Sequence, residues 1–166
     1  MFELKQFLPQ AVCLECQGCC RFSEENSIWQ PALLNEEIKI ITKGNATKEI
    51  NLTTKKIKSL PCDDYHICSF FDLANNRCRI YNIRPLECRL YPFLINKVKD
   101  TIYLSLDLKC PFIKDKLEEK ELKDYLDYLV SFLSLPVVSF AIRGNPHIFT
   151  AYPEDKQLKN LATLIF

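Results

Sequence analysis

Four of the nine cysteines in this 166-residue chain lie within eight consecutive residues, in the pattern C-x-x-C-x-x-C-C. A core rarely needs thiols this dense, and in a reducing compartment such a run is typical of metal ligands. A disulfide framework would leave one cysteine unpaired and would require an oxidising compartment, so we favour metal binding. The four are Cys13, Cys16, Cys19 and Cys20, and the others are Cys62, Cys68, Cys78, Cys88 and Cys110.

The charge balance and the distribution of apolar residues bear on partners and location. The chain has 22 basic and 21 acidic residues and a formal net charge of +1, which gives no electrostatic footprint for nucleic acid. Glu3 and Lys5 interrupt the first ten residues, and no apolar stretch approaches the roughly 20 residues of a membrane span. We therefore expect a cytoplasmic protein that binds neither nucleic acid nor a membrane.

Glycine is too scarce for the common nucleotide-binding loops. Gly18, Gly44 and Gly144 are the only glycines, and they are far apart in the sequence. Neither G-x-G-x-x-G nor G-x-x-x-x-G-K-[ST] can be drawn from them, so no motif supports ATP, NAD or FAD. A Rossmann-type site for S-adenosylmethionine lacks its glycine loop for the same reason.

Apolar spacing and end signals predict several helices. The clearest covers residues 35–43, where Asn35 can cap the start and Gly44 follows the last turn. The longest covers residues 115–133, whose apolar residues recur at helical spacing until Pro136 ends the pattern. Shorter helices are predicted at residues 1–12, 81–89 and 154–164.

The sequence also predicts one antiparallel hairpin. Residues 101–108 alternate between apolar and polar side chains, as in a half-buried strand, and residues 93–95 precede them across a short polar segment. Asn75-Asn76 marks a turn between two short extended pieces. Residues 45–60 are polar and predict a loop or an irregular extended segment.

These elements predict a small α+β fold in one domain, residues 1–166. Helices are expected to surround a short antiparallel hairpin, with a cysteine-rich metal-binding loop core. Within the domain, residues 11–112 form the cysteine-cluster metal-binding region, and residues 113–166 form a helical C-terminal extension.

The spacing of the first cysteines bears on the metal. The run Cys13, Cys16 and Cys19 matches the C-x-x-C-x-x-C of iron–sulfur proteins better than the paired knuckles of zinc ribbons. The pair at residues 110–111 provides a distant Cys-Pro of the kind that often accompanies this run. Cys20 allows several interpretations, since the side chains of adjacent cysteines diverge: it can serve a second metal or iron, or pack as a small apolar residue.

Four arginines surround Cys78 and Cys88. Several thiolates on one centre carry net negative charge, which guanidinium groups can offset. Alternatively, each arginine forms an ordinary surface pair with a carboxylate such as Asp72 or Glu87. The surface pair is the simpler account of any single arginine, whereas the clustering favours a role at a metal centre. The four are Arg77, Arg79, Arg84 and Arg89.

This pattern of residues resembles the YkgJ-type CxxCxxCC cysteine-cluster family, whose members are described as zinc- or iron-chelating proteins. The family pattern runs C-x-x-C-x-x-C-C, then C-x-[FY], then C-x-I-Y-x-x-R-P-x-x-C-R-x-[FY]-P, then a last cysteine. Every element is present here in that order, within residues 11–112. The resemblance implies metal ligands at Cys13, Cys16, Cys19, Cys20, Cys68, Cys78, Cys88 and Cys110.

The resemblance also separates the ligands from their neighbours. Cys62 has no place in the pattern and is interpreted as a buried or spare thiol. Apart from the resemblance, His66, two residues before Cys68, could be a ligand, although a solvated loop residue is the simpler account. Other motif positions are implied to support the ligands and turns: Tyr81, Arg84, Pro85, Arg89, Tyr91 and Pro92.

Three functions are compatible with these observations. The first is a cytoplasmic protein whose cysteines hold an iron–sulfur cluster of the 4Fe–4S kind. The second is a structural zinc module, in which Zn²⁺ ties the N-terminal cysteines to the later ones and the apolar C-terminal region docks a protein partner. The third is a part in protein lysine N-methylation, implied because flagellin lysine-N-methylases carry a similar cysteine module. The native metal, the number of centres and any enzymatic activity stay open.

Overall fold

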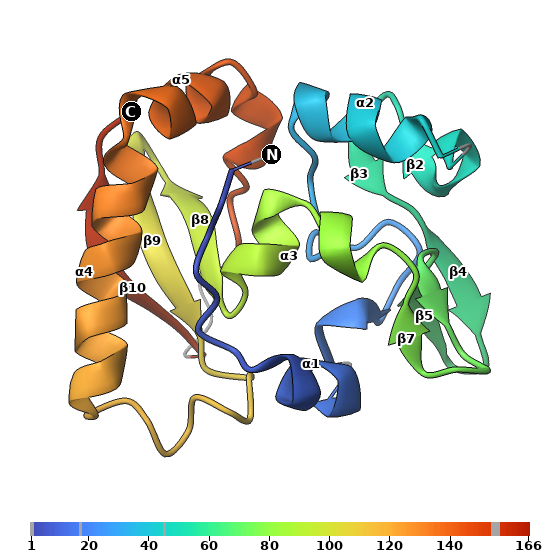
Figure 1. Ribbon diagram of the computed structural model, residues 1–166, viewed down its shortest axis with the longest axis horizontal. Helices are drawn as coiled ribbons and strands as arrows, with labels where there is room; N and C mark the ends of the chain where they lie inside the picture. The colour runs from blue at the N-terminus through green and yellow to red at the C-terminus, as the bar shows by residue number, and fades with distance from the viewer. Residues whose placement is uncertain (1, 17, 45, 154–156) are drawn as a thin grey trace. The chain divides into compact units, whose positions relative to one another are not determined.

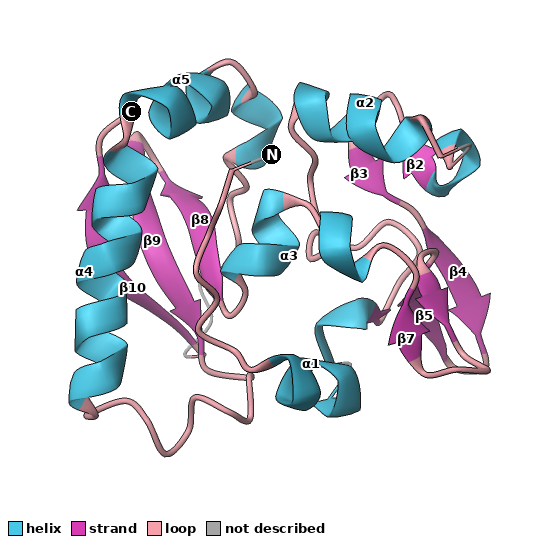
Figure 2. Ribbon diagram, in the orientation of Figure 1, coloured by secondary structure: helices cyan, strands magenta, loops and turns pink. Residues whose placement is uncertain are grey.

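The computed structural model describes residues 2–16, 18–44, 46–153 and 157–166. They form two compact units, the first of residues 9–89 and the second of residues 2–8 together with 90–166. Helices and short antiparallel strands are mixed along the chain (Figure 2), which confirms the α+β class. The α-helices are α1 (Gln10–Cys16), α2 (Asn35–Thr42), α3 (Leu86–Leu90), α4 (Lys120–Ser134) and α5 (Pro136–Arg143) (Figure 1).

The first unit is built from short strands around a small apolar core. β1 (Arg21–Phe22), β5 (Tyr65–Cys68) and β4 (Ser59–Cys62) form a three-stranded antiparallel sheet in that order. β2 (Ile50–Asn51) pairs with β3 (Lys56–Ile57), and β6 (Phe71–Asp72) pairs with β7 (Arg77–Cys78). The core cluster comprises Phe22, Leu33, Ile41, Ile50, Ile57, Cys68 and Phe70.

The loop or irregular extended segment predicted for residues 45–60 is more ordered than expected, since it contains a hairpin of two short strands. Ile50 and Ile57 face each other across the β2–β3 hairpin, and both are almost fully buried. The turn between these strands is closed by Asn51, whose Oδ1 accepts the Thr53 and Thr54 backbone N–H groups at 3.0 and 3.1 Å. The polar composition of this segment does not reveal the hairpin, because only two isoleucines in it are buried and stabilise the strand pair.

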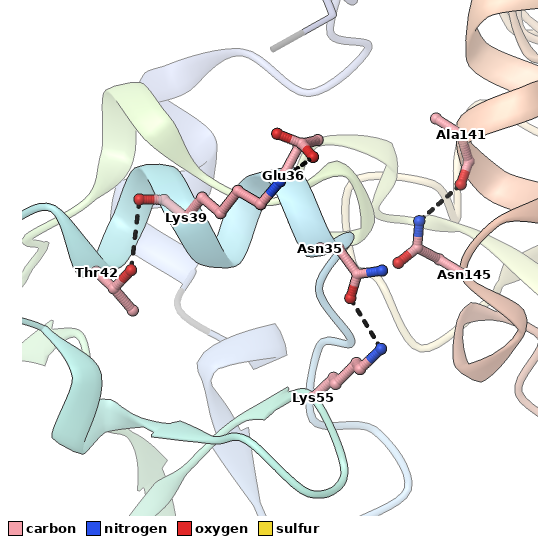
Figure 3. Close-up of polar contacts among 7 residues, drawn as sticks. All are labelled: Asn35, Glu36, Lys39, Thr42, Lys55, Ala141 and Asn145. Carbon is pink, nitrogen blue, oxygen red and sulfur yellow. Dashed lines mark hydrogen bonds and ion pairs between the residues drawn. The ribbon is translucent and has the colours of Figure 1, made fainter.

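Helix α2 confirms the predicted helix but not its cap. Asn35 is the first helical residue rather than the cap, and its Oδ1 accepts a hydrogen bond from Lys55 Nζ at 2.8 Å (Figure 3). The start is instead satisfied by Glu37, whose Oε2 accepts the backbone N–H of Leu34 at 3.0 Å. This is the carboxylate half of a capping box, three residues into the helix.

The short helix predicted for residues 81–89 is divided in two. A 3-10 turn covers Tyr81–Ile83, Arg84 is extended (φ −55°, ψ 142°), and α3 begins after Pro85. The residue before a proline is disfavoured in the helical region, so the break falls at Arg84. The turn predicted at Asn75-Asn76 is confirmed, since it joins β6 to β7 and Asn76 has a φ of 54°.

The second unit contains a three-stranded antiparallel sheet. β8 (Phe93–Val98) and β9 (Thr101–Asp107) pair from Phe93↔Leu106 to Val98↔Thr101, which confirms the predicted hairpin. β10 (Leu158–Leu164) pairs with the other edge of β9 and completes the order β10-β9-β8. The helix predicted for residues 154–164 is therefore wrong over 158–164, and residues 154–156 lie outside the described residues. The free edge of β9 decides the structure of this segment, because it offers backbone hydrogen bonds that the sequence pattern does not reveal.

Helix α4 runs along this sheet (Figure 1), with a buried stripe at helical spacing: Leu122, Tyr125, Leu129, Phe132 and Leu133. It begins later than predicted, at Lys120, because residues 111–118 form successive turns. Pro136 ends α4 and also occupies the first turn of α5, a helix that was not predicted.

Helix α5 buries Val138 and Ile142 but leaves Val137 and Phe140 66% and 75% exposed. That this region meets a protein partner stays a prediction. No single described helix is long and apolar enough to cross a membrane, and α4 with α5 meets that length and composition only when the two are joined across their 70° bend.

The helix predicted for residues 1–12 is wrong at its N-terminal end, since α1 begins only after Pro9. Residues 2–8 instead lie against the second unit, where the Phe7 ring meets Phe93 and Phe112 edge-on at centroid distances of 6.1 and 5.7 Å. The Lys5 backbone is held on both sides by α4. Tyr125 Oη donates to its carbonyl at 2.5 Å, and its N–H donates to Tyr128 Oη at 2.9 Å.

We expect substitution of either tyrosine to loosen this segment. Tyr125→Phe and Tyr128→Phe each remove one hydrogen bond worth about 1 kcal/mol, so amide exchange over residues 2–8 should accelerate by roughly 5-fold. Hydrogen exchange followed by mass spectrometry measures it, with Tyr103→Phe on β9 as the control. Unchanged exchange in both variants would show that the aromatic contacts alone hold the segment.

Candidate metal centre

Seven of the eight predicted ligands belong to the first unit, on five short elements. Two lie on α1, two on the 3-10 turn Gly18–Cys20, and one each on β5, β7 and α3. In chain order they are Cys13, Cys16, Cys19, Cys20, Cys68, Cys78 and Cys88. The eighth, Cys110, lies in the second unit, where it is 2% exposed and its N–H donates to the Asp107 carbonyl at 3.3 Å.

Local structure accounts for the placement of the N-terminal cysteines. The backbone N–H of Cys13 donates to the Pro9 carbonyl at 3.1 Å and so opens the first turn of α1. Cys16 follows at a spacing of three, which puts both thiols on one face of the helix. The 3-10 turn then presents Cys19 and Cys20. Gly18 starts this turn without a positive φ, so the bend does not depend on the conformational freedom of glycine.

The distal cysteines are placed by strand pairing and by a buried carboxylate. Cys78 pairs with Phe71 across β6–β7, and Phe71 is the third residue after Cys68 in the chain. Cys88 lies on α3, whose start is fixed by Glu37 of α2: Glu37 Oε1 accepts the Leu86 N–H at 2.7 Å and lies 3.6 Å from Arg89 Nη2. The Glu37 carboxylate therefore binds the first turn of its own helix and that of α3.

A second acidic side chain, Glu87, strengthens the attachment of α3. Glu87 Oε2 accepts the Ala32 N–H at 2.6 Å, and burial raises the pKa of Glu87 to about 8. Burial likewise raises the pKa of Glu37, against the opposing effect of its two backbone donors and Arg89. The segment that carries Cys88 is thus attached to the rest of the first unit by the hydrogen bonds of Glu37 and Glu87.

The thiols converge around Cys19. It is close enough to interact electrostatically with six others: Cys13, Cys16, Cys20, Cys68, Cys78 and Cys88. A hydrogen bond with Cys20, together with burial, raises the pKa of Cys19 well above its usual value. Burial raises the pKa of Cys68 to about 12 and that of Cys88 well above the ordinary range. These thiols are therefore neutral near pH 7 unless a cation compensates their charge.

Arg84 acts on the thiols in the opposite direction. Its side chain is buried, and its Nη1 donates to Cys13 Sγ at 3.3 Å. Its charge opposes the burial-driven rise of the pKa at Cys13 and Cys78. Arg84, one of the four arginines of the predicted group, thus binds a thiol directly.

Two of the other arginines pair with carboxylates other than those expected, and the pair of Arg89 is buried rather than at the surface. Arg79 Nη2 lies 3.7 Å from Glu49 Oε1, and Arg89 pairs with Glu37. The carboxylates named from the sequence were Asp72 and Glu87. Neighbours in the chain suggested those two, whereas the fold brings in carboxylates from 30 and 52 residues away (79 − 49 and 89 − 37).

Cys20, Cys62 and His66 lie in different surroundings. Cys20 packs against the apolar core of the first unit, so the interpretation as a small apolar residue fits its surroundings. Cys62, at the end of β4, is partly exposed and hydrogen-bonds to Tyr65 Oη at 3.3 Å. His66 is a half-buried strand residue on β5 rather than a solvated loop residue.

The arrangement is convergent but not a closed coordination shell. Within the described ranges, no group of three or more His, Cys, Asp or Glu side chains is set to hold a metal ion. The predicted cysteine-rich loop core is not confirmed, since most of these residues lie on short helices and strands. The donor chemistry nevertheless fits a thiophilic centre, because soft thiolates suit zinc and iron–sulfur clusters and most of the set is at least partly buried, with one thiol bonded to a guanidinium group.

The comparisons with known proteins agree with this chemistry. The model of the CxxCxxCC family, described as "Putative zinc- or iron-chelating domain", matches residues 12–111. That range contains all eight predicted ligands as well as Cys62. No curated protein and no solved structure matches the chain.

Proposed function

Because this chain belongs to the CxxCxxCC family of zinc- or iron-chelating domains, we propose that its cysteines hold an iron–sulfur cluster of the 4Fe–4S kind. The observation that carries the proposal is the position of Cys19, whose thiol lies within electrostatic range of six others from α1, the 3-10 turn, β5, β7 and α3. The C-x-x-C-x-x-C run that contains Cys19 is the spacing used by many iron–sulfur proteins.

The electrostatics support a cation at this place. Metal ligation requires thiolates, whereas burial favours the neutral thiol at Cys68 and Cys88. The positive charge of a bound metal centre would compensate the cost of burying thiolates, and the thiol protons would be released on binding. Burial that disfavours free thiolates is therefore compatible with a strongly bound cation. When bound, the cluster would supply one-electron chemistry or a substrate-binding iron.

The proposed ligand set is the eight motif cysteines, with Cys110 included on the family pattern. Four ligands suffice for one cluster, so the set allows a second centre. All nine cysteines, each within the described residues, are free thiols, which supports a reducing location such as the cytoplasm.

A structural zinc site is the second candidate. The family description names zinc beside iron, and the same thiolates suit Zn²⁺. In this case Zn²⁺ would tie α1 to β5, β7 and α3, and its binding energy would be folding energy.

Anaerobic purification of the full chain distinguishes the candidates. We expect a brown protein with thiolate-to-iron absorption bands and with iron and acid-labile sulfide in equal amounts. A colourless protein with stoichiometric zinc would favour the zinc site instead. A protein that takes up neither metal, also after reconstitution, would contradict both.

Alkylation footprinting gives an internal control. In the metal-free reduced protein, Cys16 is exposed and Cys68 is buried, so an alkylating reagent should modify Cys16 first. Loading with metal should protect Cys16 but leave Cys62 reactive, since Cys62 lies outside the motif. Equal reactivity of Cys16 with and without metal, measured by mass spectrometry, would argue against its ligation.

A further inference from the structure

Arg84 occupies an unusual place among the thiols of the first unit. Its guanidinium is stacked on the Tyr81 ring, with Cζ 3.7 Å from the ring centroid. Its Nε donates to the Tyr81 carbonyl at 3.2 Å, and its Nη1 donates to Cys13 Sγ at 3.3 Å. The residue is 5% exposed, so this geometry fixes the group rather than letting it move in solvent.

Burial of a guanidinium group is costly unless its charge is compensated. Arg89, which is similarly buried, meets this requirement with the carboxylate of Glu37, whereas Arg79 is half exposed beside Glu49. Arg84 directs its Nη1 at a thiol, and its charge also acts on Cys19, Cys78 and Cys88. A thiolate-rich metal centre, with its net negative charge, is the counterpart that such a buried cation fits.

We propose that Arg84 is a positioning residue of the metal centre: its guanidinium holds the Cys13 sulfur in place and supplies a permanent positive charge that offsets the thiolates. This inference rests on the proposed function and concerns the same site. The Tyr81 ring and carbonyl orient the guanidinium, and the extended Arg84 backbone before Pro85 directs the side chain from the break between the 3-10 turn and α3. Lysine lacks the planar fork that can stack on Tyr81 and bond Cys13 at once.

Titration of the reduced full chain with Co²⁺ tests this role, because sulfur-to-cobalt charge-transfer bands report the number of bound thiolates. We expect Arg84→Gln to weaken Co²⁺ binding by roughly 10- to 100-fold and to reduce the charge-transfer intensity per bound cobalt. Arg84→Lys keeps the charge, and so should recover part of the affinity without the full band intensity. Arg79→Gln, which removes an arginine paired with a carboxylate, should match the wild type in both measurements.

The outcomes distinguish a failure of the proposed function from a failure of the role assigned to Arg84. If the wild type binds neither Co²⁺ nor a cluster, the proposed function fails. If the wild type binds Co²⁺ and Arg84→Gln binds it with equal affinity and equal band intensity, the proposed function stands and the role of Arg84 is overturned. If Arg84→Gln does not fold, Arg84→Lys decides, because wild-type affinity and wild-type band intensity in that variant would overturn the positioning role of the fork.

Discussion

Replacing Glu37 with alanine is expected to lower the free energy of unfolding by about 3–5 kcal/mol, the usual cost of removing one partner from a buried ionic contact. Glu37 is 2% exposed, and its carboxylate accepts the N–H groups of Leu34 and Leu86 while lying 3.6 Å from Arg89. The alanine variant would leave two helix starts and a buried guanidinium without this acceptor at once.

Glu36, the preceding residue, provides a matched control. It lies in the same first turn of α2, but its side chain is 74% exposed, and its ion pair with Lys39 at 2.6 Å lies on the surface (Figure 3). Glu36→Ala should therefore change the unfolding free energy by no more than about 0.5 kcal/mol. Urea denaturation of both variants measures the difference. Similar losses in the two would mean that the contacts of Glu37 contribute little.

Replacing Cys19 with serine is expected to abolish stable metal binding, with a fall in affinity of more than about 100-fold. Loss of an outer contact to a metal ligand already costs 10- to 100-fold, and the loss of a ligand exceeds it. Cys19 should be the most sensitive position of the set, because its thiol interacts with those of six other cysteines. The stability that a structural metal provides, on the order of 10 kcal/mol for zinc, should be lost with it.

Cys62→Ser is the control for this experiment. Cys62 is partly exposed and outside the motif, so the variant should keep the metal content and the absorption spectrum of the wild type. Metal analysis of anaerobically purified variants, with thermal unfolding before and after chelation, gives both quantities. Full metal content in Cys19→Ser would remove this residue from the ligand set.

Periodic elements could be predicted from the sequence, and elements fixed by distant partners could not. The β8–β9 hairpin and most of α4 follow from the side chains of their own residues. The residues of β10 predict a helix by their own pattern, because the edge of β9 with which they pair lies more than 50 residues earlier in the chain. Likewise, α1 begins only after Pro9, and Phe7 before it packs against aromatic rings of the second unit instead of lying in a helix.

The candidate site shows the same division. The identities of the cysteines were evident from their spacing, and the family match covers all eight of the motif. That Arg84 would contact Cys13, 71 residues away, and that Glu37 would hold the start of α3 were not evident, since neither pair shares a local pattern. Nothing in the sequence distinguishes the buried Glu37 from the exposed Glu36 beside it, and the family pattern includes Arg84 without indicating its contact with Cys13.

The path of the chain has a consequence for its synthesis on the ribosome. Residues 2–8 are part of the same unit as α4, and the Lys5 carbonyl accepts its hydrogen bond from Tyr125, which is synthesised 120 residues later. The unit of residues 9–89 is continuous and holds seven of the motif cysteines, so nascent chains can assemble it first.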